Sequence, residues 1–111
     1  MDKTLLSGST GMLLLKLLEE QDLYGYQMIE ILRLRSDHTF DLKAGTLYPL
    51  LHTLEEKGLV TSYLEGEGES RPRKYYHLTN TGRRQLAEKE KEWRQYVGSV
   101  ERVLRGGASL A

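Results

Sequence analysis

Apolar residues recur along the first third of the chain with the spacing of two helices. The first set falls at positions i, i+1, i+4 and i+5: Leu13, Leu14, Leu17 and Leu18. This stripe is wide enough for a buried helix over residues 10–20, which Ser9 or Thr10 is placed to cap. The second set forms the apolar side of a helix from Tyr26 to Arg35: Met28, Ile29, Ile31 and Leu32. Gly25 predicts a turn between the two helices.

A third helical pattern covers the segment "AGTLYPLLHTLEEKG", Ala44 to Gly58. Its leucines lie on one face of a 3.6-residue period: Leu47, Leu50, Leu51 and Leu54. Pro49 is tolerated only near a helix start, so the first turn is expected near Ala44 to Thr46. Gly58 is expected to end the helix in a left-handed conformation. In the connector before this helix, a two-residue strand is predicted at Phe40.

The pattern then changes to one typical of a β-hairpin followed by a long helix. Leu59 to Glu65 and Arg73 to Thr79 are rich in β-branched and aromatic residues, which predicts two strands joined by a glycine-rich loop. Thr79 or Thr81 is placed to cap a last helix that reaches about Leu104. The predicted order is therefore three helices, a hairpin and a long helix.

The last helix carries an apolar seam with the repeat of a coiled coil. The spacing of its members is 7, 4, 3 and 4, with one polar gap at Glu90: Leu86, Trp93, Val97, Val100 and Leu104. One small domain cannot fully bury such a seam, which indicates a homodimer. The expected fold class is mainly α with a small β-hairpin, the layout of a winged helix-turn-helix with an appended dimerisation helix. Residues 1–79 are predicted to form the winged helix-turn-helix domain, and residues 80–111 the dimerisation helix and a short tail.

Composition restricts the chemistry of the chain. Its 111 residues include no cysteine, which excludes disulfides, thiolate zinc sites and a cysteine nucleophile and is consistent with the cytoplasm. The longest apolar run in the N-terminal region, Met12 to Leu15, is too short for a signal sequence or a membrane span. Three scattered histidines form no metal motif, and neither a nucleophile elbow nor a phosphate-binding glycine loop is present. We therefore expect no enzyme activity, metal, cofactor or membrane partner.

The distribution of charge changes what the net charge implies. A formal net charge of zero by itself argues against a nucleic-acid partner. Residues 71–84, however, contain basic residues and no acid: Arg71, Arg73, Lys74, Arg83 and Arg84. Such an edge still attracts a polyanion, because exposed charges act over about 10 Å at ordinary salt.

The face of the third helix opposite its leucines carries side chains suited to DNA bases. Tyr48 and His52 lie about 40° apart on that face, and both can donate or accept hydrogen bonds. Thr46 and Pro49 offer apolar contact to a thymine methyl. Residues near the start of a recognition helix reach base edges, and Lys43, just before the helix, suits a phosphate. The alternative is an ordinary surface helix, because periodicity alone shows only burial.

The hairpin adds a second candidate DNA contact. Arg71, Arg73 and Lys74 flank Pro72 at the end of the loop, where they suit phosphates or the minor groove. The same loop carries acids that partly cancel this charge: Glu65, Glu67 and Glu69. A solvated, charged hairpin without DNA contacts is the alternative.

Two segments together resemble the PadR family of bacterial transcriptional regulators: "GTLYPLLHTLEEKGLV" and "RPRKYYHLTNTGRRQL". The "YGY" at Tyr24 to Tyr26 extends the resemblance, which runs from about Leu13 to Leu104. The single long C-terminal helix is similar to the short PadR subfamily. The resemblance implies a recognition helix at the third helix, a wing at the hairpin and a dimer through the last helix. It further implies a homodimer that represses genes by occupying a pseudo-palindromic DNA operator.

Trp93 is the only tryptophan, and it lies on the predicted dimer seam. Packing at the interface is the favoured interpretation of this side chain. Some short PadR members bind flat aromatic compounds at the dimer interface, so the resemblance implies a second role as a stacking platform. Met12 and Val97 are the expected walls of such a site, and release of the operator by a planar ligand is a hypothesis.

A winged helix that binds protein without sequence-specific DNA binding is the alternative function. Such a module would not need basic residues that flank one helix face: Lys43, Arg71, Arg73 and Lys74. Binding that is insensitive to salt and indifferent to DNA would favour this alternative.

Overall fold

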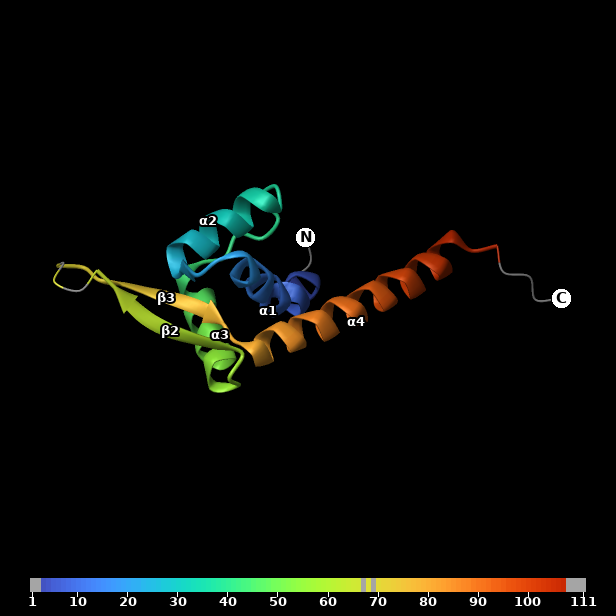
Figure 1. Cartoon of the computed structure of the whole chain (residues 1–111). Helices are drawn as coiled ribbons and strands as arrows, with labels where there is room; N and C mark the ends of the chain where they lie inside the picture. The colour runs from blue at the N-terminus through green and yellow to red at the C-terminus, as the bar shows by residue number, and fades with distance from the viewer. Residues whose placement is uncertain (1–2, 67, 69, 108–111) are drawn as a thin grey trace.

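The computed structural model describes residues 3–66, 68 and 70–107, with side chains from Gly8 onward. Its elements are, in order, α1 (Lys3–Glu20), β1 (Leu23–Tyr24), α2 (Gly25–Arg35), α3 (Ala44–Glu56), β2 (Val60–Glu65), β3 (Arg73–Leu78) and α4 (Asn80–Arg105). The hairpin of β2 and β3 projects to one side of α1, α2 and α3, and α4 extends to the other (Figure 1). These elements confirm the predicted fold class. The end of the predicted tail, residues 108–111, and the loop acids Glu67 and Glu69 lie outside the described residues.

The hydrophobic core surrounds α1. Leu14 and Leu15 are fully buried, and Leu17 and Leu18 nearly so. Helix α1 packs against α2, β3 and α4, and the other elements complete the core with Met28, Leu32, Leu47, Leu51, Leu54, Leu59, Val60, Leu78 and Leu86. Each such side chain contributes about 1.5–3 kcal/mol when fully buried, so this cluster holds the three helices and the sheet together.

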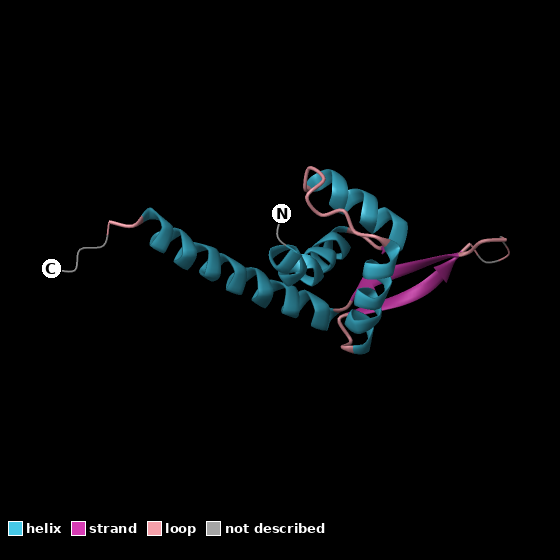
Figure 2. Cartoon of the chain, turned by 180° about the vertical axis from the view of Figure 1, so that it is seen from behind, coloured by secondary structure: helices cyan, strands magenta, loops and turns pink. Residues whose placement is uncertain are grey.

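The sheet has three antiparallel strands in the order β1-β3-β2. Its register places Tyr63 opposite Tyr75. Successive side chains of a strand point to opposite faces, and in β3 this buries Tyr76 and Leu78 against the helices. Tyr75 and His77 therefore lie on the outer face, away from the core. Seen from behind, α3 lies across the base of the hairpin (Figure 2).

Two local predictions for the first part of the chain are wrong. Helix α1 begins at Lys3, so Ser9 and Thr10 lie inside the helix, where both are buried, and do not cap it. The glycines beside them cost only about 1 kcal/mol each in a helix, less than the loss of several backbone hydrogen bonds. The two-residue strand lies at Leu23–Tyr24 rather than at Phe40, because a strand needs a neighbour and the free edge of β3 meets only the earlier segment. Gly25 begins α2.

A compact junction joins the end of α3, the end of β3 and the start of α4. The Thr79 side chain donates to the carbonyl of Gly58 at 2.7 Å and accepts from the amide of Gly82 at 2.9 Å, which confirms Thr79 as the cap of α4. The amide of Thr79 donates to the carbonyl of Leu59 at 3.1 Å. Gly58 has the predicted left-handed φ of 73°. A Cβ at Gly82 would overlap this Leu59 carbonyl oxygen, so only glycine lets α4 approach so closely.

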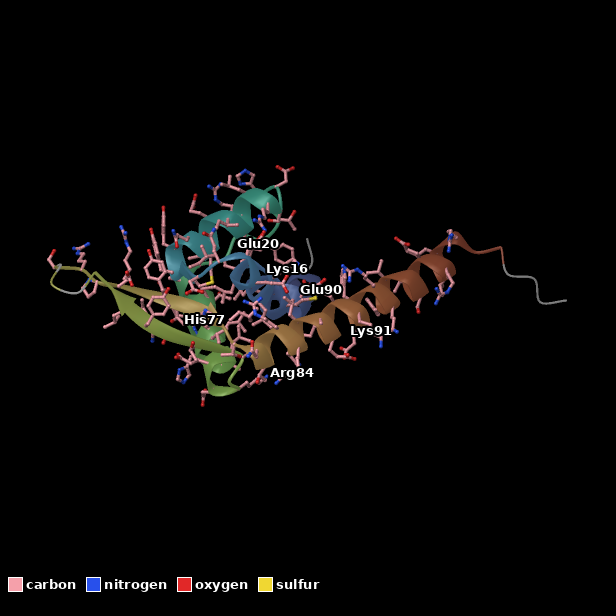
Figure 3. The ribbon with its side chains drawn as sticks, viewed as in Figure 1. Lys16, Glu20, His77, Arg84, Glu90 and Lys91 are labelled. Atoms are coloured by element: carbon pink, nitrogen blue, oxygen red, sulfur yellow. The ribbon has the colours of Figure 1, made fainter. Side chains whose placement is uncertain are left out.

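Glu90, the polar gap in the seam, has a structural explanation. Its carboxylate lies 3.5 Å from the Lys16 ammonium on α1 and 3.2 Å from the Arg94 guanidinium on the next turn of α4. Figure 3 shows Lys16 and Glu90 on facing sides of the two helices. The polar position therefore faces α1 of the same chain.

We predict that Gly82→Ala lowers the free energy of unfolding by about 1–3 kcal/mol, because the new methyl group overlaps backbone that cannot move away. The matched control is Gly45→Ala in α3, where a Cβ would meet nothing within 4 Å. That change should stabilise by up to about 1 kcal/mol through helix propensity. Urea unfolding measures both. Equal free energies for the two variants would show that the close approach at Gly82 is not a constraint.

Candidate nucleic-acid interface

The first turns of α3 present an exposed face free of acids. Helix α3 begins after Lys43 and has no acidic residue in its first turn. Thr46, Pro49 and His52 are exposed on the side opposite the buried leucines. Lys43 is exposed as well, with its ammonium 3.5 Å from the Asp41 carboxylate. Four of the predicted DNA-contacting residues are thus exposed in or just before the first half of α3.

Tyr48 is more engaged in packing than the sequence suggests. A Cβ at Gly25 would lie only 2.5 Å from its hydroxyl oxygen, so the ring covers the first turn of α2 and explains the glycine there. The side chain remains 46% exposed. Its hydroxyl therefore lies beside the N-terminus of α2, where unpaired backbone N–H groups attract negative charge.

His52 lies further along the exposed face and is paired on its own helix. Its Nε2 is 3.2 Å from a carboxylate oxygen of Glu56, one turn away, and both side chains are largely exposed. Exposed pairs of this kind are weak, about 0.3–0.5 kcal/mol. His52 can therefore exchange Glu56 for another partner at little cost.

Strand alternation separates two wing residues that the sequence placed in one cluster. Arg73 lies on the outer face, where its guanidinium stacks 4.9 Å from the ring centroid of Tyr24 and the register places Glu65 opposite it. Lys74 lies on the helix side of the sheet, its Nζ 5.7 Å from the ring of Tyr76. Arg71, in the loop, is exposed.

Tyr76 shows which element this inner face meets. Burial raises the pKa of its phenol, and the nearby Glu55 and Tyr48 of α3 raise it further. On the same inner face the Ser62 hydroxyl donates to the Glu55 carboxylate at 2.7 Å, so this face meets α3. Lys74, one step further out on the same face, therefore lies on the α3 side of the sheet.

The outer face of the sheet carries a polar cluster that the sequence analysis missed. One carboxylate oxygen of Asp22 accepts from the Tyr63 hydroxyl at 2.7 Å, and the other lies 2.8 Å from Nδ1 of His77. Partial burial raises the pKa of Asp22, but the hydrogen bonds from His77 and Tyr63 outweigh it, so the pKa lies below its usual value. The same hydrogen bond raises the pKa of Tyr63 to about 12. The partners are distant in sequence, so no local motif marks them.

Three tyrosines continue this cluster toward the wing. The Tyr63 and Tyr75 rings stack with centroids 5.7 Å apart, and Tyr24 meets Tyr75 edge-on at 5.4 Å. Arg73 covers the free side of Tyr24. Aromatic pairs in these geometries are worth about 0.5–1.5 kcal/mol beyond their buried area. The side chains of the outer face are therefore paired with one another, although Tyr63, Arg73 and His77 remain exposed.

The seam of α4 is only partly as predicted. Leu86 is 1% exposed and belongs to the core of its own chain. Trp93, Val100 and Leu104 are exposed, whereas Val97 is half-buried. The structure adds further exposed apolar side chains on α4 that the heptad count missed: Tyr96 and Val103. The far half of α4 therefore leaves apolar surface uncovered within the single chain.

A hollow of about 530 Å³ lies between α1, α3 and the middle of α4. Its walls include Met12, Leu50, Lys57, Lys89, Trp93 and Tyr96. Met12 and Trp93 both line this hollow, whereas Val97, the other predicted wall, does not. Leu50 and Tyr96 were not predicted to line this hollow, because the leucine pattern of α3 assigns Leu50 to the core and Tyr96 lies off the heptad of α4.

Other kinds of site find no support in the described part of the chain. Residues 3–66, 68 and 70–107 contain no group of three or more histidine and acidic side chains able to hold a metal ion. Within the same residues, no helix is long and apolar enough to cross a membrane.

Three helices followed by a hairpin whose inner face packs on the last of them define a winged-helix fold. Residues 14–88 match the sequence profile described as the Transcriptional regulator PadR-like family. The chain belongs to this family, and membership implies DNA-binding regulation rather than catalysis.

Individual relatives agree with this assignment. Transcriptional regulator Rv3488 of Mycobacterium tuberculosis is 36% identical over an alignment that covers 67% of this chain and 64% of that protein. A PadR family transcriptional regulator from Eggerthella lenta is 40% identical, with a TM-score of 0.80 over 91% of this chain and 86% of its own. A transcriptional regulator from Clostridium thermocellum has a TM-score of 0.84 at 29% identity, covering 92% and 96% of the two chains.

The lowered pKa of Asp22 predicts a specific pH dependence of stability. A carboxyl with a folded-state pKa below its unfolded value stabilises the fold above the unfolded pKa, and this contribution is lost as pH falls through the folded pKa. Asp22→Asn should therefore lower the free energy of unfolding at neutral pH, and the gap to wild type should close in acid. Denaturant titrations from pH 7 to pH 2 measure this gap. A gap that stays constant with pH would mean that the charge of Asp22 is not what stabilises the cluster.

Proposed function

We propose that this protein is a homodimeric repressor that occupies a pseudo-palindromic DNA operator. The observation that supports it most directly is the exposed face of α3, which has no acid in its first turn and carries Thr46, Pro49 and His52, with Lys43 exposed just before the helix. The major groove of DNA accepts one helix, and its base edges offer hydrogen-bond partners to histidine and apolar contact to threonine and proline. A dimer seated on a promoter represses by excluding other proteins from it.

In this proposal residues 1–79 form the DNA-binding domain, and residues 80–111 the dimerisation helix and its tail. Thr46, Pro49 and His52 contact base edges. Tyr48 packs its hydroxyl against Gly25 of α2 and offers the exposed part of its side chain to the DNA at the junction of α2 and α3. In this division of roles, α3 reads the base sequence and the wing contacts the sugar–phosphate backbone of the DNA.

Lys43, Arg71 and Lys74 are the proposed phosphate contacts. Lys43 precedes the N-terminus of α3, and Lys74 lies on the face of the wing that the sheet turns toward α3. Arg73 supports the wing through its stack on Tyr24 and reaches DNA less directly. In this proposal a chain of zero net charge attracts DNA locally, because residues 71–84 contain basic groups and no acid.

We predict that His52→Ala weakens specific binding by about 1–3 kcal/mol and leaves non-specific binding nearly unchanged. Lys74→Ala should weaken binding to all sequences alike. It should also reduce the slope of log affinity against log salt concentration by about one unit, because one fewer counterion is released from the DNA on binding. Fluorescence anisotropy with a selected duplex and with a scrambled duplex, each at several salt concentrations, measures both effects.

Lys91→Ala is the charge-matched control for Lys74→Ala. Lys91 is exposed on α4 (Figure 3), away from α3 and the wing, so its loss should leave affinity and salt slope almost unaltered. If His52→Ala and Lys74→Ala change both duplexes in the same proportion, the proposed division between reading and anchoring is wrong.

The far half of α4 is the proposed dimer contact. Trp93, Val100 and Leu104 are exposed there, and Val97 is half-buried. We predict that Val97→Glu together with Val100→Glu yields monomers in light scattering, because two charges would be buried without partners. Gln95→Glu adds a charge to an exposed position of the same helix and should leave the dimer intact. A dimer that survives the double change would rule out this contact.

A planar aromatic ligand bound in the hollow at Trp93 is proposed to release the operator. Leu50 and Lys57 of α3 line the same hollow as Trp93 and Met12, so a guest there contacts the proposed recognition helix directly. Release requires that the ligand prefer the state that does not bind DNA, because equal affinity for both states shifts nothing.

Trp93 is the only tryptophan, so its fluorescence reports the hollow without a label. We predict saturable quenching by some members of a panel of planar aromatic dyes, with a parallel loss of operator affinity. Trp93→Ala should abolish dye binding in calorimetry while the protein stays folded. Saturable binding without any change in operator affinity would contradict the release mechanism, and no binding by any dye would return Trp93 to a packing role.

A winged helix that binds protein and not DNA is the remaining candidate function. Retention of a partner protein at high salt, together with no preference among duplexes, would favour it over the operator proposal.

A further inference from the structure

The wing extends beyond the core that anchors its base. Val60 and Leu78 at the base are buried, whereas Leu64 and Lys74 further out are exposed. In Figure 1 the outer part of β2 and β3 stands clear of the helices. A two-stranded ribbon is twisted and only marginally stable by itself, so its direction must be set by contacts at its base and on its outer face.

Asp22 provides a fixed point on that outer face. It follows α1 closely and precedes Leu23, and both Leu18 on one side and Leu23 on the other are 2% exposed. The backbone at Asp22 is therefore held by the core. Its carboxylate, by contrast, points outward and is occupied by two partners.

The two partners come from different strands of the hairpin. Tyr63 lies on β2 and His77 on β3, and each uses a separate oxygen of the carboxylate. The register pairs Thr61 with His77 and Tyr63 with Tyr75, so the two partners lie diagonally across the ribbon. A rigid group that holds two diagonal points fixes both the tilt and the twist of a ribbon.

We propose that Asp22 is a positioning residue for the wing: it accepts hydrogen bonds from both strands and so holds Lys74 at the angle at which the wing and α3 meet the same DNA duplex. This inference rests on the proposed DNA-binding function. The stack of Tyr63 on Tyr75, and of Tyr75 against Tyr24, carries the constraint outward to the level of Arg73 and Lys74.

The sign of the expected effect separates this role from simple electrostatics. Asp22→Asn removes a negative charge, which by itself favours binding to a polyanion. The amide keeps one acceptor oxygen but replaces the other with an NH2 group, so one of the two partners must reverse its hydrogen-bonding role, and neither bond is made to a charged carboxylate any longer. Loss of positioning predicts weaker binding, opposite to the charge effect. Asp37→Asn, an exposed carboxylate at a left-handed position that asparagine tolerates, is the charge-matched control.

A double-mutant cycle tests whether Asp22 acts through the wing. Asp22→Asn should reduce affinity for a selected duplex about tenfold in the wild-type background and about tenfold in the His52→Ala background. In the Lys74→Ala background it should cause almost no further loss, because the contact it positions is already gone. Tyr63→Phe, which keeps the ring stack and removes the hydroxyl, should show the same pattern with a smaller loss. An equal loss in all three backgrounds would identify a general structural role and overturn the proposal.

A second measurement needs no DNA. The chain has no cysteine, so spin labels attach only at introduced cysteines, at Leu64→Cys on β2 and Leu34→Cys on α2, both exposed positions. Labelled protein diluted with unlabelled protein reports the distance within one chain. The distribution should be narrow in the parent and broad or shifted with Asp22→Asn, but not with Asp37→Asn. An unchanged distance distribution with Asp22→Asn overturns the proposal. If the parent protein binds no duplex, the DNA-binding function is refuted, and the distance distribution alone then tests whether Asp22 positions the wing.

Discussion

The close approach of Gly82 to the backbone of Leu59 determines how the two ends of the molecule are related. This is the point at which α3 has just ended, β3 ends and α4 begins. The Thr79 side chain donates to the carbonyl of Gly58, just after α3, and caps α4 by accepting from the amide of Gly82. A larger residue at Gly82 would push α4 away from the sheet. The contacts of Thr79 and Gly82 with Gly58 and Leu59 thus set the direction of α4 relative to α3.

That relation matters because α4 carries apolar surface that the single chain leaves exposed. If two copies meet along it, the separation of the two α3 helices follows from the direction in which each α4 leaves its own domain. The pairing of Lys16 with Glu90 supports the same geometry from α1. The hollow beside Trp93 is lined by residues of α1, α3 and α4. A ligand bound there would therefore change the direction of α4 relative to α3.

Much of the fold could be predicted because its determinants are local. The leucine spacing of α3, the left-handed Gly58 and the cap at Thr79 each follow from a few neighbouring residues. The wrong predictions concern partners that come from elsewhere. Phe40 lacks a neighbouring strand, whereas Leu23–Tyr24 meets the edge of β3.

In the candidate site, too, the features that depend on neighbouring residues could be predicted, and those that depend on distant ones could not. The exposed face of α3 could be predicted from its period, but the packing of Tyr48 on Gly25 could not, because the two lie on different helices. Leu86 fits a heptad and yet is buried by its own domain. Arg73 and Lys74 are adjacent in sequence and lie on opposite faces of the sheet. The hydrogen bonds of Asp22 with Tyr63 and His77 join three separate segments of the chain, so they become apparent only in the folded structure.

In the proposed dimer, two copies of α3 read DNA in a fixed relation to each other. Selection of bound duplexes from a random pool, followed by sequencing, tests it most directly. The account predicts an inverted repeat whose half-sites are centred about one helical turn, roughly 34 Å, apart. A pool that yields no consensus after repeated rounds, or a single half-site without its inverted copy, would contradict it.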